Sequence, residues 1–430
     1  MQRFIAQFRK EDGALSLLAI FWMSIFIVVG GLSLDVANVY RARTVLQETV
    51  DSAALGGLYM RNTMDAQSAT NKALAIANMN LGTMDPGSVL EADVTFGRWN
   101  EETLVFTPDI TSRSAVRVSA GRLKSRGNQL PTYLMRIIGR SYWDVATYAI
   151  AETYRPKCLT EGWIADGQLD LQSNNLFSNG FCLHSNTGIS INQNNEFESG
   201  TIVSMPSLDL LDGPNSMFEK NEGLAEALRE NFYQIRILSR IDEIIADMSS
   251  ESAERLPDYI KEPGKKYLIG SNVPTSTFVA GNVYDLYCSK SNGVNIDGPL
   301  IKEVVIIAHC PVQFSSGAAL EDVVLVNTST DNQSIYAPSN LRIGKKDGCA
   351  EGGGAQIVTK GGFKVASGLS MYGGQIIAKG DVIFEANENG VNGSSIISGG
   401  KIDATSNSSA GYCGTGMEDN FELDYFRLVE

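Results

Sequence analysis

Apolar residues follow three successive patterns along the chain. Leu15 to Leu34 form a run of 20 residues without a charge, and at about 1.5 Å per residue such a helix spans a hydrocarbon core of roughly 30 Å. Apolar positions then recur every three or four residues as far as Leu58, which predicts that the helix continues beyond a membrane. Later, short alternating segments are separated by Gly, Asn and Ser, which predicts strands joined by tight turns.

A cleaved signal peptide is the alternative reading of the apolar run. The hydrophobic region of a signal peptide is normally shorter and is followed by a small-x-small cleavage site, which is missing from this sequence after the run. Arg3, Arg9 and Lys10 precede the run and Asp35 closes it. This bias favours a cytoplasmic N-terminus and export of everything after Asp35.

Residues 83–155 are expected to form a small α+β domain. Alternating segments predict strands within 91–99, 102–108 and 114–120, a short helix over 128–139 and a closing strand over 143–153. We interpret the two tryptophans of this region, Trp99 and Trp143, as core or rim aromatics rather than as binding platforms.

Internal repetition is the strongest signal in the second half of the chain. Residues 167–180 match residues 188–200 at a shift of 20, which aligns Asn174 and Asn175 with Asn194 and Asn195, and Phe177 with Phe197. Further repeats align residues 356–367, 375–386 and 395–406, and Glu303 with Asp322, at shifts of 19 or 20. Because so short a unit cannot bury its own apolar face, the units must stack, which predicts a right-handed parallel β-helix with amide ladders at its turns.

These patterns predict a mainly β protein of five segments. They are a cytoplasmic N-terminus at 1–12, a transmembrane helix at 13–35, an extracytoplasmic helix at 36–82, the α+β domain at 83–155 and the parallel β-helix at 156–430. Apolar residues with helical spacing interrupt the last segment at about 215–258. They predict an inserted helix or hairpin that lies along the solenoid or caps it.

Charge and cysteine content narrow the compartment and the partners. A net charge of −14 argues against a nucleic-acid partner, because neutralising phosphates needs clustered Lys and Arg. The cysteines are even in number, all follow residue 157 and none forms a CxxC motif, which favours up to three disulfides in an oxidising compartment, with buried free thiols as the alternative. The candidates are Cys158, Cys182, Cys288, Cys310, Cys349 and Cys413, and their connectivity stays open.

Two sets of residues could carry chemistry. Cys182 and His184 are expected on one face of a strand, where a zinc site with His309 or Cys310, or a nucleophile pair, is conceivable, but the spacing suits neither. Acidic residues of the repeats could serve a polysaccharide-active enzyme, but no two align at one rung position; they are Asp170, Glu196, Glu198, Asp381, Glu385 and Asp403. We therefore predict no catalytic residue, no metal site, no cofactor and no enzymatic activity.

The N-terminal 50 residues resemble a known family. The stretch FRKEDGALSLLAIFWMSIFIVVGGLSLDVANVYRARTVLQETVDSAALGG is similar to TadE/TadG-like Flp-pilus (tight adherence) assembly proteins, and the positions that carry the resemblance are Gly13, Asp35, Tyr40, Gln47, Asp51, Ala53, Ala54 and Leu55. Two features of such proteins are missing. Gly13 is followed by Leu18 where prepilin processing requires Glu, and Asn327 and Asp331 replace the Asp and Ser of a von Willebrand A metal motif.

The resemblance implies a membrane-anchored structural component of Flp/Tad pilus assembly or adherence machinery. Such a protein would be single-pass in the bacterial inner membrane, with its bulk in the periplasm. Its partners would be the membrane, other pilus-assembly envelope proteins and surface glycans. The alternatives are a membrane-anchored β-helix polysaccharide lyase or glycosidase, and a carbohydrate-binding adhesin.

Overall fold

The computed structural model describes residues 12–82, 87–250, 252, 255–290, 293–404 and 406–429, and it is mainly β with one long N-terminal helix. The chain forms two compact units. Unit 1 contains the residues up to Tyr154 and those from Asp424 onward, and unit 2 contains Arg155–Leu423. Each unit has its own hydrophobic core and is described separately.

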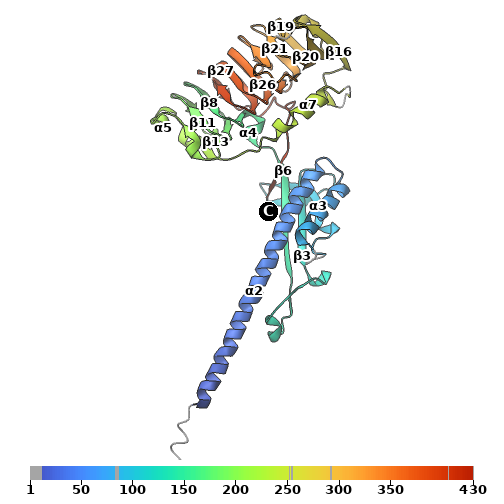
Figure 1. Cartoon of the computed structure of the whole chain (residues 1–430), viewed down its shortest axis with the longest axis vertical. Helices are drawn as coiled ribbons and strands as arrows, with labels where there is room; N and C mark the ends of the chain where they lie inside the picture. Colours follow the sequence, from blue (N-terminus) through green and yellow to red (C-terminus); the bar gives the residue numbers. More distant parts are fainter. Residues whose placement is uncertain are drawn as a thin grey trace, which may run out of the picture. The chain divides into compact units, whose positions relative to one another are not determined.

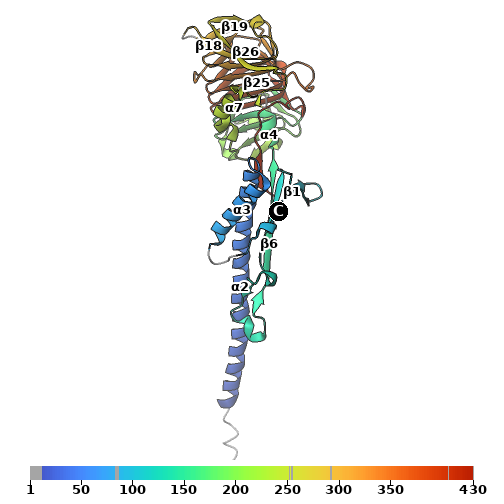
Figure 2. The same ribbon diagram turned by 90° about the vertical axis from the view of Figure 1, so that its right-hand side faces the viewer.

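Residues 36–82 lie in two helices rather than in the single helix expected, and the first of the two already contains the apolar run. Helix α2 (Asp12–Arg61) ends at a short turn, and α3 (Ala66–Leu81) packs back against it (Figures 1 and 2). Asp65 begins α3 as an N-cap, because its carboxylate accepts a hydrogen bond from the backbone N–H of Ser68 at 2.9 Å. Gly57 lets the helices approach closely, since a Cβ there would lie 2.9 Å from the Cβ of Ala73.

An antiparallel five-stranded sheet covers the second half of α2. Its strand order is β2-β1-β3-β6-β30, with β1 (Val94–Asn100), β2 (Val105–Pro108), β3 (Ala115–Arg122), β6 (Val145–Tyr154) and β30 (Tyr425–Leu428). Apolar residues of α2 and α3 form one buried cluster with Val116, Val118 and Ala149 of the sheet. Two short 3-10 turns, η2 (Glu91–Asp93) and η3 (Lys124–Arg126), complete this layer.

The last strand contradicts the expectation that the solenoid extends to residue 430. β30 pairs antiparallel with β6, placing Tyr425 opposite Tyr154, and Arg427 bonds to Glu152 at 2.6 Å. A sequence pattern cannot show this pairing, because the two strands are about 270 residues apart. Unit 2 is therefore inserted between two neighbouring strands of unit 1.

The helix expected over 128–139 is a hairpin instead. β4 (Leu130–Pro131) pairs with β5 (Tyr142–Trp143), and only the 3-10 turn η4 (Met135–Ile138) lies between them. Gly139 ends that turn at a φ of 89°, a left-handed conformation that glycine adopts without cost. The apolar spacing that suggested a helix reflects contacts with α2, described below.

Unit 2 consists of one extended set of parallel strands, as expected for a β-helix (Figure 1). After the short helix α4 (Lys157–Thr160), three rungs of three strands follow: β7 (Gly162–Ala165), β8 (Leu169–Leu171) and β9 (Leu176–Ser178); β10 (Cys182–Ser185), β11 (Ile189–Ile191) and β12 (Glu196–Phe197); β13 (Ile202–Met205), β14 (Leu211–Asp212) and β15 (Leu228–Glu230). The predicted shift of 20 is confirmed, since Leu169 pairs with Ile189 and the rings of Phe177 and Phe197 stack at 5.2 Å.

The remaining strands run from residue 262 to residue 411, again with parallel pairing throughout. They are β16 (Glu262–Gly270), β17 (Asn272–Pro274), β18 (Asn282–Cys288), β19 (Val294–Asp297), β20 (Leu300–Ala308), β21 (Val312–Phe314), β22 (Ala319–Asn327), β23 (Ile335–Ala337), β24 (Arg342–Ile343), β25 (Ala355–Thr359), β26 (Phe363–Ala378), β27 (Val382–Ser398), β28 (Ile402–Ala404) and β29 (Ser409–Gly411). The predicted alignments recur here: Gln356 pairs with Gln375, and Gln375 with Ser395.

The order of rungs in space differs from their order in sequence. β7 pairs with β10 on one side and with β27 on the other, and β8 and β9 likewise lie between β11 and β28 and between β12 and β29. The first rung of the chain therefore docks on the last. The chain enters in the middle of the stack, winds to one end, crosses to the other end and winds back to where it began.

The crossing segment contains less helix than the predicted insertion at 215–258. Among the described residues of this segment, α5 (Met217–Lys220) and α6 (Leu224–Ala227) are single turns, and only η6 (Arg236–Arg240) and α7 (Ile241–Met248) form a longer helical stretch. Apolar residues of this stretch, such as Ile241 and Ile245, pack on outward-facing strand residues from several rungs. The segment thus lies along the stack, which was one of the two expected arrangements.

The predicted amide ladder is confirmed and continues beyond two rungs. Asn175 Nδ2 donates to Asn195 Oδ1 at 2.9 Å, Asn195 Nδ2 donates to Asn221 Oδ1 at 3.0 Å, and Ser408 Oγ donates to Asn175 Oδ1 at 2.7 Å. All four residues are buried. The ladder satisfies polar groups at the turns and crosses the contact between the first and last rungs.

Candidate functional site

The signature residues of the sequence lie mainly where α2 docks on the sheet. Gln47 Nε2 donates to Asp51 Oδ1 at 2.7 Å and to the carbonyl of Tyr148 at 3.3 Å, and Thr147 donates to Gln47 Oε1. One side chain thus connects two turns of α2 to strand β6. We call this contact the Gln47 seam.

The small signature residues explain how closely the helix approaches the sheet. Ala53 and Ala54 are fully buried, and Leu55 packs on the same cluster. Larger side chains at the two alanines would overpack the cluster that α2 forms with α3 and the sheet. Tyr40, by contrast, is exposed, so this residue is available to a partner or to a membrane surface.

Asp35 is a buried carboxylate at the end of the apolar run. Its oxygens accept hydrogen bonds from the backbone N–H groups of Tyr133, Leu134 and Met135, at 2.5, 3.0 and 2.6 Å. Gly31 permits this approach, because a Cβ there would lie 2.6 Å from the Cβ of Leu134. Sequence reasoning identified Asp35 from its place at the end of the span and missed these partners about 100 residues later.

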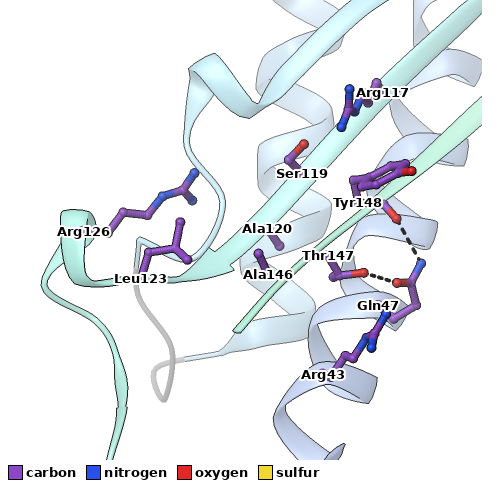
Figure 3. A pocket seen from close by; sticks show the side chains of 10 residues that line it. All are labelled: Arg43, Gln47, Arg117, Ser119, Ala120, Leu123, Arg126, Ala146, Thr147 and Tyr148. Atoms are coloured by element: carbon purple, nitrogen blue, oxygen red, sulfur yellow. Dashed lines mark hydrogen bonds between the residues drawn. The ribbon is translucent and has the colours of Figure 1, made fainter. Parts of the chain in front are cut away.

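Beside the Gln47 seam, the surface of unit 1 has a hollow of ≈ 610 Å³ (Figure 3). Three arginines from α2, β3 and the following turn line it: Arg43, Arg117 and Arg126. The guanidinium of Arg117 lies 4.3 Å from the ring centroid of Tyr148. Arg126 donates to Asp93 at 2.6 Å, so its orientation is fixed by the domain.

The chemistry of this hollow suits the binding of an anion. Three of its ten lining residues are arginines. Guanidinium groups suit a carboxylate or phosphate, with which they form charge-assisted hydrogen bonds. Sequence reasoning missed the hollow, because its arginines are brought together by the sheet.

In unit 2 the six candidate cysteines pair as three disulfides. The bonds are Cys158–Cys182, Cys288–Cys310 and Cys349–Cys413, with Cα–Cα distances of 5.0, 6.1 and 6.2 Å. Cys182 and Cys310 are therefore not free to act as nucleophiles or as thiolate ligands. Within the described ranges, no group of three or more His, Cys, Asp or Glu side chains is arranged to hold a metal ion.

His184 is held as a structural residue. Both ring nitrogens have partners at 2.8 Å, Ser204 Oγ for Nδ1 and Asn186 Oδ1 for Nε2, and the ring is fully buried against Tyr233. Burial lowers the pKa of His184, although the two hydrogen bonds favour its charged form. The imidazole is thus neutral near pH 7, with no nitrogen left for a ligand.

One expectation about the acidic residues is wrong. Asp170 and Asp403 occupy the same rung position, directly opposite each other, because the first rung docks on the last. Lys401 Nζ lies 3.2 Å from Asp403 Oδ2, and Gln172 donates to Asp170 at 3.2 Å. The other four acids lie at other rung positions: Glu196, Glu198, Asp381 and Glu385. Repeat alignment misses the pair, because it compares rungs that are adjacent in sequence.

Different protein families match unit 1 and unit 2. Residues 13–72 match a family described as Flp pilus-assembly TadE/G-like, and residues 52–151 match one described as Tad-like Flp pilus-assembly. Residues 162–414, more than half of the chain, match the domain of unknown function DUF7867. The chain is a TadE/G-like Flp pilus-assembly protein of the DUF7867 family. No curated protein and no solved structure matches it.

The boundaries of the family matches have a structural meaning. All eight signature residues of this TadE/G-like protein lie within residues 13–72. The Tad-like match ends in β6, and the DUF7867 match begins at Gly162, the first residue of β7, and ends just after Cys413. The DUF7867 domain is therefore the stack itself, including the contact of its first and last rungs.

Replacing Asp35 tests its role in holding the hairpin. In Asp35→Ala the amides of Tyr133, Leu134 and Met135 lose their acceptor, and we expect their hydrogen exchange to accelerate by roughly tenfold or more. Hydrogen-exchange mass spectrometry of the full chain in detergent measures this. The control is Glu48→Ala, an exposed acid on the same helix, and equal exchange in both variants would contradict the role.

Proposed function

We propose that this protein is a membrane-anchored structural component of a Tad-type pilus-assembly apparatus. The observation that supports this proposal most directly is that α2 passes from an exposed apolar part to a buried part. In the apolar first part of this helix, 6% of the most apolar 18-residue window is buried within the protein, whereas the second part, from Leu46 to Leu58, contributes to the core of a TadE/G-like domain. One helix thus has a solvent-exposed apolar half, called the bare half below, and a half that the rest of unit 1 buries.

A lipid bilayer is the environment that best fits the bare half. Its large apolar residues are exposed, among them Leu17, Phe21, Trp22 and Phe26, and an exposed apolar surface of this length is strongly unfavourable in water. The basic residues that precede it, and the disulfides of unit 2, support a cytoplasmic N-terminus and a periplasmic bulk. We therefore place the chain in the inner membrane as a single-pass protein.

The proposed role of the exported part is interaction rather than catalysis. The arginine-lined hollow beside the Gln47 seam offers a site for an acidic segment of another Tad envelope protein. The DUF7867 domain, proposed to be a right-handed β-helix, offers a long rigid surface for envelope proteins or surface glycans. Each rung of such a solenoid supports only its neighbours, and the disulfides and the ladder stabilise the whole.

Genetic complementation tests the proposed function. Deleting the gene in its host should abolish pilus assembly and surface attachment, and the unchanged gene should restore both. Phe26→Arg with Val28→Arg should fail to restore them, because each Arg costs roughly 2.5–3.5 kcal/mol near the centre of a span. The control is Leu104→Arg, an exposed apolar residue after β1. Pili and attachment that survive the gene deletion would contradict the proposal.

A polysaccharide hydrolase remains the second candidate, because one observation favours it. Asp170, Asp403 and Lys401 combine two carboxylates with a basic group on adjacent rungs. Burial, and then the charge of Asp403, raise the pKa of Asp170, whereas Lys401 opposes the shift. A raised carboxyl pKa is typical of a general acid in glycoside hydrolysis. The same shift also arises in a carboxylate pair without any catalytic role.

The variant Asp170→Asn tests the raised pKa of Asp170, which both readings of the carboxylate pair share. A raised native pKa means that ionised Asp170 destabilises the fold above its unfolded pKa, so both readings predict that the variant melts about 1–2 °C higher at pH 7. This gain should vanish as the pH falls below about 4, where both states are protonated. Thermal melting from pH 3 to 8 measures it.

Activity assays separate the catalytic reading of the carboxylate pair from the structural one. Asp170→Asn and Asp403→Asn should leave the release of reducing sugar from bacterial surface polysaccharides unchanged from that of the parent chain. Glu385→Gln, an exposed acid at another rung position, serves as the matched control. Cleavage by the parent chain that both aspartate variants abolish would establish the hydrolase instead.

A further inference from the structure

The hairpin of residues 130–143 carries an apolar tip that the rest of unit 1 leaves largely exposed. Tyr133, Ile137, Ile138 and Tyr142 are 58%, 70%, 60% and 55% exposed. Single exposed apolar residues are common on protein surfaces, but four within ten residues form a patch that marks an interaction site.

The tip lies against the apolar run of α2. Leu134, Met135, Ile137 and Ile138 line a small apolar crevice together with Ile27, Val28 and Leu32, and the hairpin extends beside α2 in both views (Figures 1 and 2). The three hydrogen bonds to Asp35 fix it there. The tip therefore has a defined level along the helix.

That level follows from helix geometry. Leu32 and Ile27 precede Asp35 by three and eight residues, which corresponds to about 4 and 12 Å along the axis. A span that crosses a bilayer up to Asp35 thus carries the tip below its outer end. Helical segments that lie in the membrane interface bury their apolar face about 5–10 Å deep. This depth agrees with the distance of the tip below the outer end of the span.

The polar groups of the hairpin suit this position. The β4–β5 pairing, the bond from Thr132 Oγ1 to the carbonyl of Arg140 at 2.6 Å and the bonds to Asp35 satisfy backbone groups near the tip, as lipid contact requires. The aromatic rings of Tyr133, Tyr142 and Trp143 match the residues favoured at membrane interfaces. Arg136 and Arg140 are exposed, and long arginine side chains can reach lipid phosphates.

We propose that residues 133–142 form a second membrane contact, inserted in the outer leaflet of the membrane that α2 spans. Ile137 and Ile138 lie among acyl chains, and Arg136 and Arg140 bind phosphate groups of phospholipids. This proposal rests on the anchoring role proposed for α2. Two contacts with one leaflet restrict the tilt and rotation of the first exported domain, which a single span leaves free.

Spin labelling of the full chain in vesicles of phosphatidylethanolamine and phosphatidylglycerol tests the insertion. A nitroxide is attached to Ile138→Cys, to Ile137→Cys as a second position, to Phe26→Cys in the span and to Leu104→Cys as an exposed apolar control. We expect labels at 137 and 138 to collide with oxygen severalfold more than with a water-soluble nickel reagent, as at position 26. The label at position 104 should show the opposite ratio.

The outcomes distinguish this proposal from the anchoring that it assumes. Aqueous ratios at both 137 and 138, with a lipid ratio at 26, would overturn the insertion and leave the anchor intact. An aqueous ratio at position 26 would overturn the anchor. No other protein is present in the vesicles, so a tip that is instead covered by a partner protein would also give aqueous ratios at both positions.

Discussion

The docking of α2 on its sheet is the contact on which the rest of unit 1 depends. Ala53 and Ala54 bring the helix close, and the Gln47 seam fixes its register on β6. Because α2 continues without a break from the bare apolar run into this docked half, the position of the domain follows the position of the helix. The TadE/G-like signature therefore describes a rigid connection between the apolar run and the sheet of unit 1, and most of its residues serve that connection.

A second constraint shapes unit 2, namely that its first and last rungs are neighbours. This buried contact has an apolar part and a polar part. Trp163 pairs with Ile396 in the core, and Ser408 donates a hydrogen bond to Asn175 in the amide ladder. Glu161, also buried, accepts the backbone N–H groups of Cys413 and Gly414. The two ends of the domain are thereby tied together, which suits a domain inserted between β6 and β30.

Features that depend on local sequence were predictable, and features that depend on distant pairing were not. The helix over the apolar run, the shift of 20 and the asparagine ladder were predicted correctly, because each compares residues within about 20 positions. The break before α3 was missed, because the capping side chain of Asp65 outweighs a helical apolar spacing. Three features depend on a partner about 100 or more residues away. They are the docking of the hairpin on Asp35, the pairing of β30 with β6 and the Asp170–Asp403 pair. Neither propensity nor repeat alignment contains that information.

Thiol labelling of spheroplasts tests whether α2 crosses the inner membrane with the bulk of the chain outside, as proposed above. The full chain carries one added cysteine, Gln7→Cys before the span or Ser125→Cys in unit 1, while its own six cysteines remain in disulfides. A membrane-impermeant maleimide should modify position 125 in intact spheroplasts and position 7 only after lysis. Modification of position 7 in intact spheroplasts, or of position 125 only after lysis, would contradict the account.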